Sequence, residues 1–190
     1  MRKRSAEAGA LGLVLTICVL FVMCGVSTTV RAGSDGTGVL ETDDISIILE
    51  GEGVWIRITP LDDSILKYCT EDTRRTYTTI LKSHTEIPKD SKNRMFLVLF
   101  QGRAEPETYF EPTELEIIHQ GNRSRPEKIV PHSSTFNKRL LKFYGTPEMA
   151  IYLFSAEIDL EFPVSFKYRT LENNDWEGVV RKIKAAKSRY

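Results

Sequence analysis

The side chains that could act as nucleophiles are few and widely spaced in this 190-residue chain. A catalytic thiol or hydroxyl needs a base within hydrogen-bond reach and a third group that orients the base. The three histidines, His84, His119 and His132, are the natural bases, but no spacing brings one of them close to Cys69. Cys69 is therefore interpreted as a small buried apolar residue. An intermolecular disulfide is the remaining alternative for its thiol.

The same histidines do not form a metal-binding motif. Metal sites that can be recognised from sequence use short spacings such as H-x-H or H-E-x-x-H, and natural zinc sites usually combine three or four protein ligands. The histidines are far apart in the chain, so the sequence predicts no metal ligand and no cofactor. His119 is in phase with Leu115 and Ile117, which favours a partly buried histidine facing the core.

Two further groups of polar residues have simpler explanations than catalysis. Ser133-Ser134 lacks the G-x-S-x-G pattern of a nucleophile elbow, and both serines fit the cap of a helix. Glu111, Glu114 and Glu116 are close in sequence, as catalytic carboxylate pairs can be. Two of them alternate with apolar residues, which is typical of the solvated face of a strand. The sequence thus predicts no catalytic residue.

The N-terminus has the three parts of a secretory signal peptide. Residues 2–4 are basic, residues 8–30 are uncharged with an apolar centre, and Val30-Arg31-Ala32 resembles a cleavage site. We therefore predict a signal peptide at residues 1–32 and a protein that is secreted, periplasmic or attached to the cell envelope.

Two alternatives for this segment stay open. The uncharged run is long enough to span a bilayer, which takes about 17–25 residues, so it could remain as a membrane anchor. Lipidation at Cys24 is the other alternative, although Met23 stands where the bacterial pattern has a small residue. Cleavage before Gly33 would leave Cys69 as the single cysteine, which excludes an internal disulfide.

The charge balance argues against a nucleic-acid partner. The chain has 26 basic and 26 acidic residues, and the segment beyond residue 32 has a net charge of −3. A nucleic-acid-binding domain would show a basic excess. Residues 33–43 begin with a Gly/Ser-rich stretch and are predicted as a flexible lead-in. Residues 44–190 have the length of a single domain.

Hydrophobic periodicity predicts mostly strands in the first half of that domain. Residues 45–49 and 54–58 read as a hairpin around Gly51-Glu52-Gly53. Residues 61–84 change to helical spacing and predict one bent helix or two short ones, with the polar centre 70–76 as the break. The uninterrupted apolar run 95–100 predicts a central strand buried on both faces.

The second half continues this pattern. Residues 115–117 predict a strand, 127–130 its antiparallel return, 133–144 a short helix, and 149–154 another apolar strand. Apolar residues then occupy every second position from Ile158 to Tyr168, which predicts six side chains on one inner sheet face. Pro163 lies within this run and implies an edge strand, a bulge or a break into two strands.

The chain ends in a basic amphipathic helix. Trp176, Val179, Val180 and Ile183 share a face that is expected to dock on the domain. The basic residues on the other side complement the helix dipole, and they also suit a membrane surface or an acidic partner. Together the elements predict an immunoglobulin-like antiparallel β-sandwich with short interspersed helices and a C-terminal helix.

These observations predict an exported, non-catalytic binding or assembly module of the cell envelope or extracellular space. Its partner would be a protein or envelope component, with possible membrane-surface contact through the C-terminal helix. The alternative is an extracytoplasmic hydrolase whose residues converge from distant loops. A purely structural envelope component is a third interpretation.

Overall fold

The computed structural model describes residues 38–189 except 52, 89–90, 104–106, 137–139 and 143–144. The predicted signal peptide, residues 1–32, lies outside the described residues. Within the described ranges, no helix combines the length and the apolar character needed to cross a membrane.

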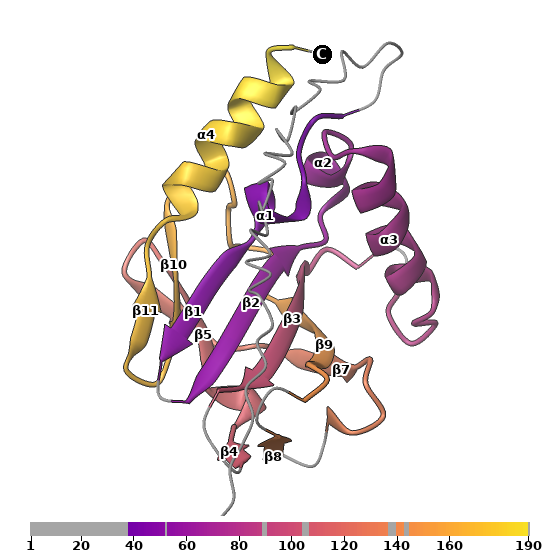
Figure 1. The fold of residues 1–190 in the computed structure, drawn as a ribbon. Helices are drawn as coiled ribbons and strands as arrows, with labels where there is room; N and C mark the ends of the chain where they lie inside the picture. The colour runs from indigo at the N-terminus through magenta and orange to yellow at the C-terminus, as the bar shows by residue number, and fades with distance from the viewer. Residues whose placement is uncertain are drawn as a thin grey trace, which may run out of the picture. The chain divides into compact units, whose positions relative to one another are not determined.

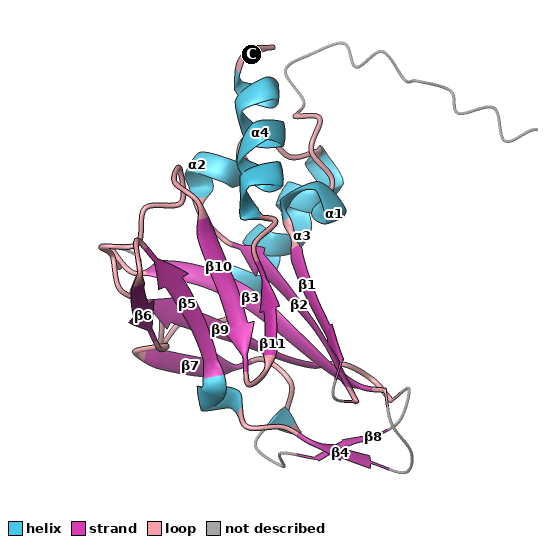
Figure 2. Ribbon diagram, turned by 90° about the vertical axis from the view of Figure 1, so that its left-hand side faces the viewer, coloured by secondary structure: helices cyan, strands magenta, loops and turns pink. Residues whose placement is uncertain are grey.

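The fold is mainly β and consists of two antiparallel sheets that face each other (Figure 2). The five-stranded sheet has the order β1 (Ile47–Gly51), β2 (Val54–Pro60), β3 (Arg94–Gly102), β9 (Glu148–Phe154) and β7 (Lys128–Pro131). The four-stranded sheet has the order β11 (Leu171–Asn173), β10 (Val164–Tyr168), β5 (Leu115–His119) and β6 (Asn122–Ser124). A small pair, β4 (Glu107–Tyr109) and β8 (Leu140–Lys142), lies at one end of the sandwich. This arrangement confirms the predicted β-sandwich with short helices.

The core lies between the inner faces of the two sheets. In β10, the buried residues Val164, Phe166 and Tyr168 alternate with half-buried polar residues, as a strand with one face in the core requires. Their partners across the sandwich include Phe96 and Phe100 of β3. The ring centroids of Phe96 and Phe166 are 5.5 Å apart and those of Phe100 and Tyr168 are 5.9 Å apart. Both pairs meet edge to face, which is a favourable aromatic geometry.

The helices gather at the end of the sandwich opposite β4 and β8 (Figure 1). They are α1 (Thr42–Ile45), α2 (Asp63–Leu66), α3 (Glu71–Lys82) and α4 (Trp176–Lys187), and a 3₁₀ turn, η1 (Pro112–Glu114), precedes β5. The predicted helical region 61–84 is confirmed as two helices, but the break is at Lys67–Thr70, earlier than predicted. The hairpin of β1 and β2 and the central position of β3 are also confirmed.

Two predicted elements are wrong. Residues 127–130 do not return beside β5: the return strand is the short β6, and β7 joins the other sheet next to β9. The predicted helix over 133–144 is wrong at its C-terminal end, because Leu140–Lys142 is the strand β8 paired with β4. Residues 137–139 and 143–144 of that prediction lie outside the described residues. The apolar spacing there satisfied a helical pattern, but pairing with β4 supplies the backbone partners instead.

The predicted long strand from Ile158 to Tyr168 is also wrong in its first half. Only Val164–Tyr168 forms a strand, and residues 158–163 form turns before it. Ile158 and Leu160 are buried, but Phe162 is 52% exposed. Pro163 explains the difference, because proline cannot donate a backbone hydrogen bond to a neighbouring strand.

A candidate binding site beside the C-terminal helix

The apolar face of α4 anchors this helix on the sandwich, as the sequence predicts. Trp176, Val179, Val180 and Ile183 are all buried, and Trp176 is completely inaccessible. The indole Nε1 of Trp176 donates a hydrogen bond to the carbonyl oxygen of Leu160 at 2.9 Å. This bond ties the start of α4 to the 158–163 turns, so the two segments are held side by side.

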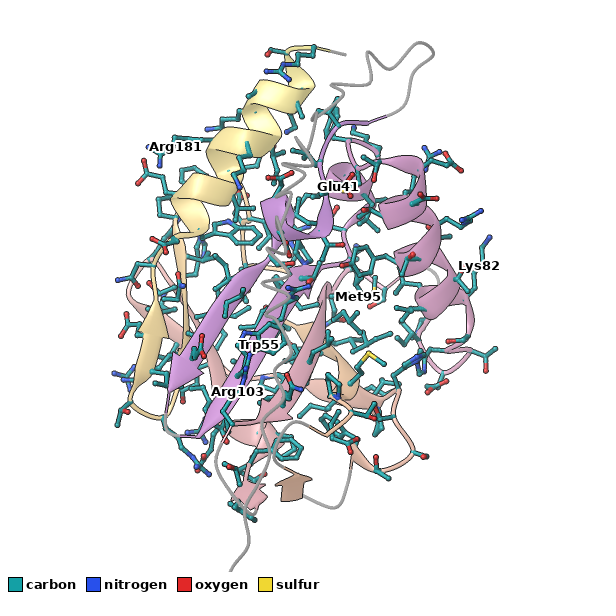
Figure 3. All side chains as sticks on the ribbon, viewed as in Figure 1. Glu41, Trp55, Lys82, Met95, Arg103 and Arg181 are labelled. Atoms are coloured by element: carbon teal, nitrogen blue, oxygen red, sulfur yellow. The ribbon has the colours of Figure 1, made fainter. Side chains whose placement is uncertain are left out.

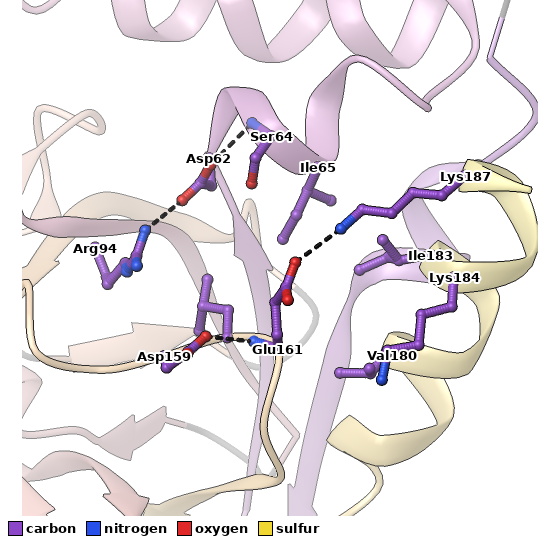
Figure 4. A pocket seen from close by; sticks show the side chains of 11 residues that line it. Asp62, Ser64, Ile65, Arg94, Asp159, Glu161, Val180, Ile183, Lys184 and Lys187 are labelled. Atoms are coloured by element: carbon purple, nitrogen blue, oxygen red, sulfur yellow. Dashed lines mark hydrogen bonds and ion pairs between the residues drawn. The ribbon is translucent and has the colours of Figure 1, made fainter. Parts of the chain in front are cut away.

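A cavity of about 190 Å³ lies where α4 and the 158–163 turns meet α2 (Figure 4). Four apolar side chains contribute to its lining: Ile65, Leu160, Val180 and Ile183. Sites for drug-sized ligands have volumes of about 300–1,000 Å³. This cavity is smaller, so it matches a single side chain or a group of similar size.

One side of the cavity is closed by an ion pair between α2 and β3. Arg94 Nη1 lies 2.8 Å from Asp62 Oδ2, and Arg94 Nε donates to the carbonyl oxygen of Ile158 at 2.7 Å. Burial alone would raise the pKa of the Asp62 carboxyl, but hydrogen bonds from Ser64 and the nearby Arg94 guanidinium lower the pKa overall. Asp62 is therefore held as a carboxylate that fixes Arg94 in place.

The other side is closed by an ion pair between the turns and α4. Lys187 Nζ lies 2.8 Å from Glu161 Oε1, and this hydrogen bond raises the pKa of Lys187. The backbone N–H of Glu161 donates to Asp159 Oδ1 at 2.9 Å, which fixes the turn that presents Glu161. Because Glu161 and Lys187 are largely exposed, their pairing contributes little stability and can open.

A shallow groove continues from the cavity along α4. Phe162, Pro163, Val180, Arg181 and Lys184 contribute to its lining, and Lys184 and Val180 also line the cavity. Among the described residues, no ion pair neutralises Arg181 or Lys184, whereas Lys182 on the same helix pairs with Asp44 at 3.0 Å. The groove thus combines an exposed aromatic ring with two cations (Arg181 is labelled in Figure 3).

The residues that the sequence singled out lie elsewhere. Cys69 is 1% exposed, as predicted, but it sits in the link between α2 and α3 rather than on a helix face. Burial raises the pKa of its thiol to about 11, with smaller contributions from Glu41 and Asp44. A thiol of that pKa is a poor nucleophile at neutral pH. Ser133 Oγ accepts a hydrogen bond from the N–H of Met149 at 2.7 Å, so it supports the backbone near β9.

The three glutamates do not form a catalytic pair. Glu114 pairs with Arg169 at 2.6 Å, Glu116 pairs with Arg125 at 3.0 Å, and Glu111 accepts a hydrogen bond from the Thr113 hydroxyl at 2.9 Å. The predicted solvated strand face does not describe them: Glu114 lies in η1 before the strand, and the side chain of Glu116 in β5 is only 13% exposed.

His119 is partly buried at the end of β5, as predicted, and its buried Nε2 atom has no hydrogen-bond partner among the described residues. The other two histidines are arranged in a way that the sequence did not indicate. His84 and His132 are 48 positions apart in sequence, yet Nε2 of His84 lies 2.8 Å from Nδ1 of His132. No sequence motif signals this contact, because it depends on how the end of α3 packs beside the end of β7.

Comparisons with protein-family models, with curated proteins and with solved structures gave no match to this chain. Over the described ranges, no group of three or more histidine, cysteine, aspartate or glutamate residues is placed to hold a metal ion. What the cavity and groove offer is an apolar recess bordered by charges of both signs.

Proposed function

We propose that this protein is an exported, non-catalytic binding module that recognises a protein segment through the cavity and groove beside α4. The observation that carries the proposal is the continuity of these two features. The recess matches one apolar side chain, and the groove next to it presents Phe162, Arg181 and Lys184. Aromatic and arginine residues around a recess are typical of the residues that dominate binding energy at protein interfaces.

Charge supports an acidic segment as the partner. Arg181 and Lys184 are exposed and no ion pair neutralises them among the described residues, whereas Glu161 in the same groove pairs with Lys187. The two cations are therefore available to a partner carboxylate. A partner carboxylate next to an apolar anchor would pair with Lys184 while the anchor enters the recess. Opening of the Glu161–Lys187 ion pair would widen the entrance.

A membrane surface fits this site less well than a peptide does. Anionic lipid favours basic residues without neighbouring carboxylates. The exposed carboxylate of Glu177 lies in the same groove, and a broad anionic surface would meet it, whereas the side chain of a peptide can contact Lys184 alone. We therefore favour a peptide partner, and binding to anionic vesicles is measured as the competing result.

The hydrolase alternative is supported less well by the same geometry. Such an enzyme needs a nucleophile next to a base. Among the described residues that line the cavity there is no histidine and no cysteine. Two of its three carboxylates, Asp62 and Glu161, pair with cations, and the third, Asp159, accepts the backbone N–H of Glu161. These two ion pairs join the segments that surround the cavity, as expected for a preformed binding recess.

Selection from a random peptide library displayed on phage tests the proposal. We expect enriched peptides to carry a large apolar residue flanked by Asp or Glu. Titration of a selected peptide should shift the methyl NMR signals of Ile65, Leu160, Val180 and Ile183. Methyl groups of Leu97 and Ile151, which lie in the five-stranded sheet, serve as the control.

Absence of enrichment, or shifts at Leu97 and Ile151 in place of the cavity residues, would reject this function. Binding to anionic vesicles without any peptide enrichment would favour membrane contact instead. Two finer predictions accompany the proposal: export with cleavage before Gly33, which N-terminal sequencing tests, and an immunoglobulin-like arrangement of the sheets, which an experimental structure tests.

A further inference from the structure

The contact between His84 and His132 joins two distant parts of the chain. His84 follows the C-terminal end of α3, and His132 follows β7. Besides the 2.8 Å contact between Nε2 of His84 and Nδ1 of His132, the ring centroids are 5.1 Å apart and the rings are inclined by 58°. The two nitrogens thus face each other and share one proton in a hydrogen bond.

The neighbouring carboxylate defines the tautomer of the first ring. Glu86 Oε1 lies 3.2 Å from Nδ1 of His84. A carboxylate accepts hydrogen bonds, so this contact places the proton of neutral His84 on Nδ1 and leaves the lone pair of Nε2 facing His132. A carboxylate that orients a histidine in this way is the usual second partner of a metal-ligating imidazole.

We propose that His84 and His132 bind a divalent transition-metal ion of the zinc, copper or nickel type, through Nε2 of His84 and Nδ1 of His132. Imidazole suits all three metals. Glu86 would orient His84 through its Nδ1 proton.

The rearrangement that a metal requires is small. Tetrahedral zinc with bonds of about 2.0–2.1 Å to nitrogen separates two such ligands by about 3.3 Å, so the contact must open by about 0.5 Å. His132 is partly exposed, which leaves its ring room to move. Its Nδ1 proton passes to Nε2 by exchange with water, so the ring stays neutral and no net proton is released.

The first ligand is already held in place before a metal ion binds. The side chain of His84 is only 9% exposed, so its orientation is set by packing and by Glu86. Metal ions bind the neutral form of histidine.

The site would be open and exchangeable. With two protein ligands, water must complete the coordination, whereas closed structural zinc sites use four protein ligands. The spacing of the histidines in the sequence predicted no metal ligand, because that spacing could not show the contact between His84 and His132. It is also independent of the α4 site, since it uses α3 and β7.

Titration of the reduced, chelator-treated full chain with ZnCl₂ and NiCl₂ tests this site, with calorimetry and histidine ring NMR as readouts. We expect one ion per chain, with shifts at His84 and His132 and none at His119. His132→Gln should abolish binding, and His119→Gln, which alters the one remaining histidine, should leave binding intact. Glu86→Gln should weaken binding by about 10–100-fold.

Thermal unfolding of each variant shows whether it is folded, and His132→Gln carries the test because the His132 ring is partly exposed. No binding by the wild-type chain at millimolar metal would overturn the proposal. So would binding that persists unchanged in folded His132→Gln, since other ligands would then be responsible.

Discussion

Helices α3 and α4 have the same length, 12 residues, but are held to the domain in different ways. In α4, five residues are buried, and the ring of Trp176 packs against Phe166 of the core with ring centroids 5.7 Å apart. In α3, the buried residues are Thr73 and Tyr77, and the Tyr77 hydroxyl donates to Thr42 Oγ1 at 2.9 Å. A helix anchored by a large apolar face can expose cations without depending on them for stability.

The difference also separates two kinds of site. The cations of α4 border a recess and a groove, which suits recognition of a partner. The end of α3 places His84 next to His132, which suits a small ion. Substitutions in the two regions should therefore differ in their effects on stability and binding.

Replacing Trp176 with Ala should lower the free energy of unfolding by about 3–5 kcal/mol, because it empties a fully buried site. The matched change in α3, Ile80→Ala, should lower it by about 1 kcal/mol, since Ile80 is only partly buried. Urea unfolding measures both. Equal losses would mean that the two helices are anchored alike.

Phe166 and Phe162 give a second comparison, within one predicted strand. Phe166→Ala should destabilise the protein by about 3–5 kcal/mol, as expected for emptying a buried aromatic site. Phe162→Ala should change stability by less than about 0.5 kcal/mol, because its ring is exposed next to α4. Urea unfolding of both variants is the measurement, and a large loss for Phe162→Ala would place that ring in the core.

Cys69 tests how the link between α2 and α3 is held. Its backbone pairs with Leu40, and its side chain is buried, so Cys69→Ser should lower stability by about 1–3 kcal/mol through a buried hydroxyl without full partners. Native-state labelling with a thiol reagent should be slow, because the pKa of this thiol is raised to about 11. Rapid labelling at neutral pH would contradict the burial.

The Asp62–Arg94 ion pair at the cavity should make the free energy of unfolding decrease at acidic pH. The folded-state pKa of Asp62 is lowered, so its contribution is complete above the unfolded pKa of about 3.9 and is lost as pH falls through the folded value. The pair is partly exposed, which limits the effect to about 1 kcal/mol. Urea midpoints at several pH values should show a smaller acid loss in Asp62→Asn than in wild type. Parallel curves would rule out the contribution of this carboxylate.

The sequence predicted features that lie within one segment better than features that join distant segments. The docking face of α4 could be predicted because its apolar residues recur at helical spacing within one segment. Phe162 could not be placed correctly, since apolar alternation continues through Pro163 while backbone pairing does not. The cavity joins residues from α2, β3, the turns and α4, and the histidine contact joins positions 48 apart. Such sites depend on tertiary packing, which a single sequence does not encode as a local pattern.

The central claim is that the α4 surface binds an acidic partner segment, and matched charge reversals test it most directly. Lys184 and Lys82 lie in the last turns of α4 and α3, and both are exposed. Each Lys→Glu change alters the net charge equally and should change stability by less than about 0.5 kcal/mol. Calorimetry with a peptide selected on the wild-type protein, below and above 0.15 M salt, where the Debye length is about 8 Å, compares the two variants. We predict at least about a tenfold loss of affinity, or about 1.4 kcal/mol, for Lys184→Glu at low salt and little change for Lys82→Glu. Equal affinities of the two variants would contradict a binding site at α4.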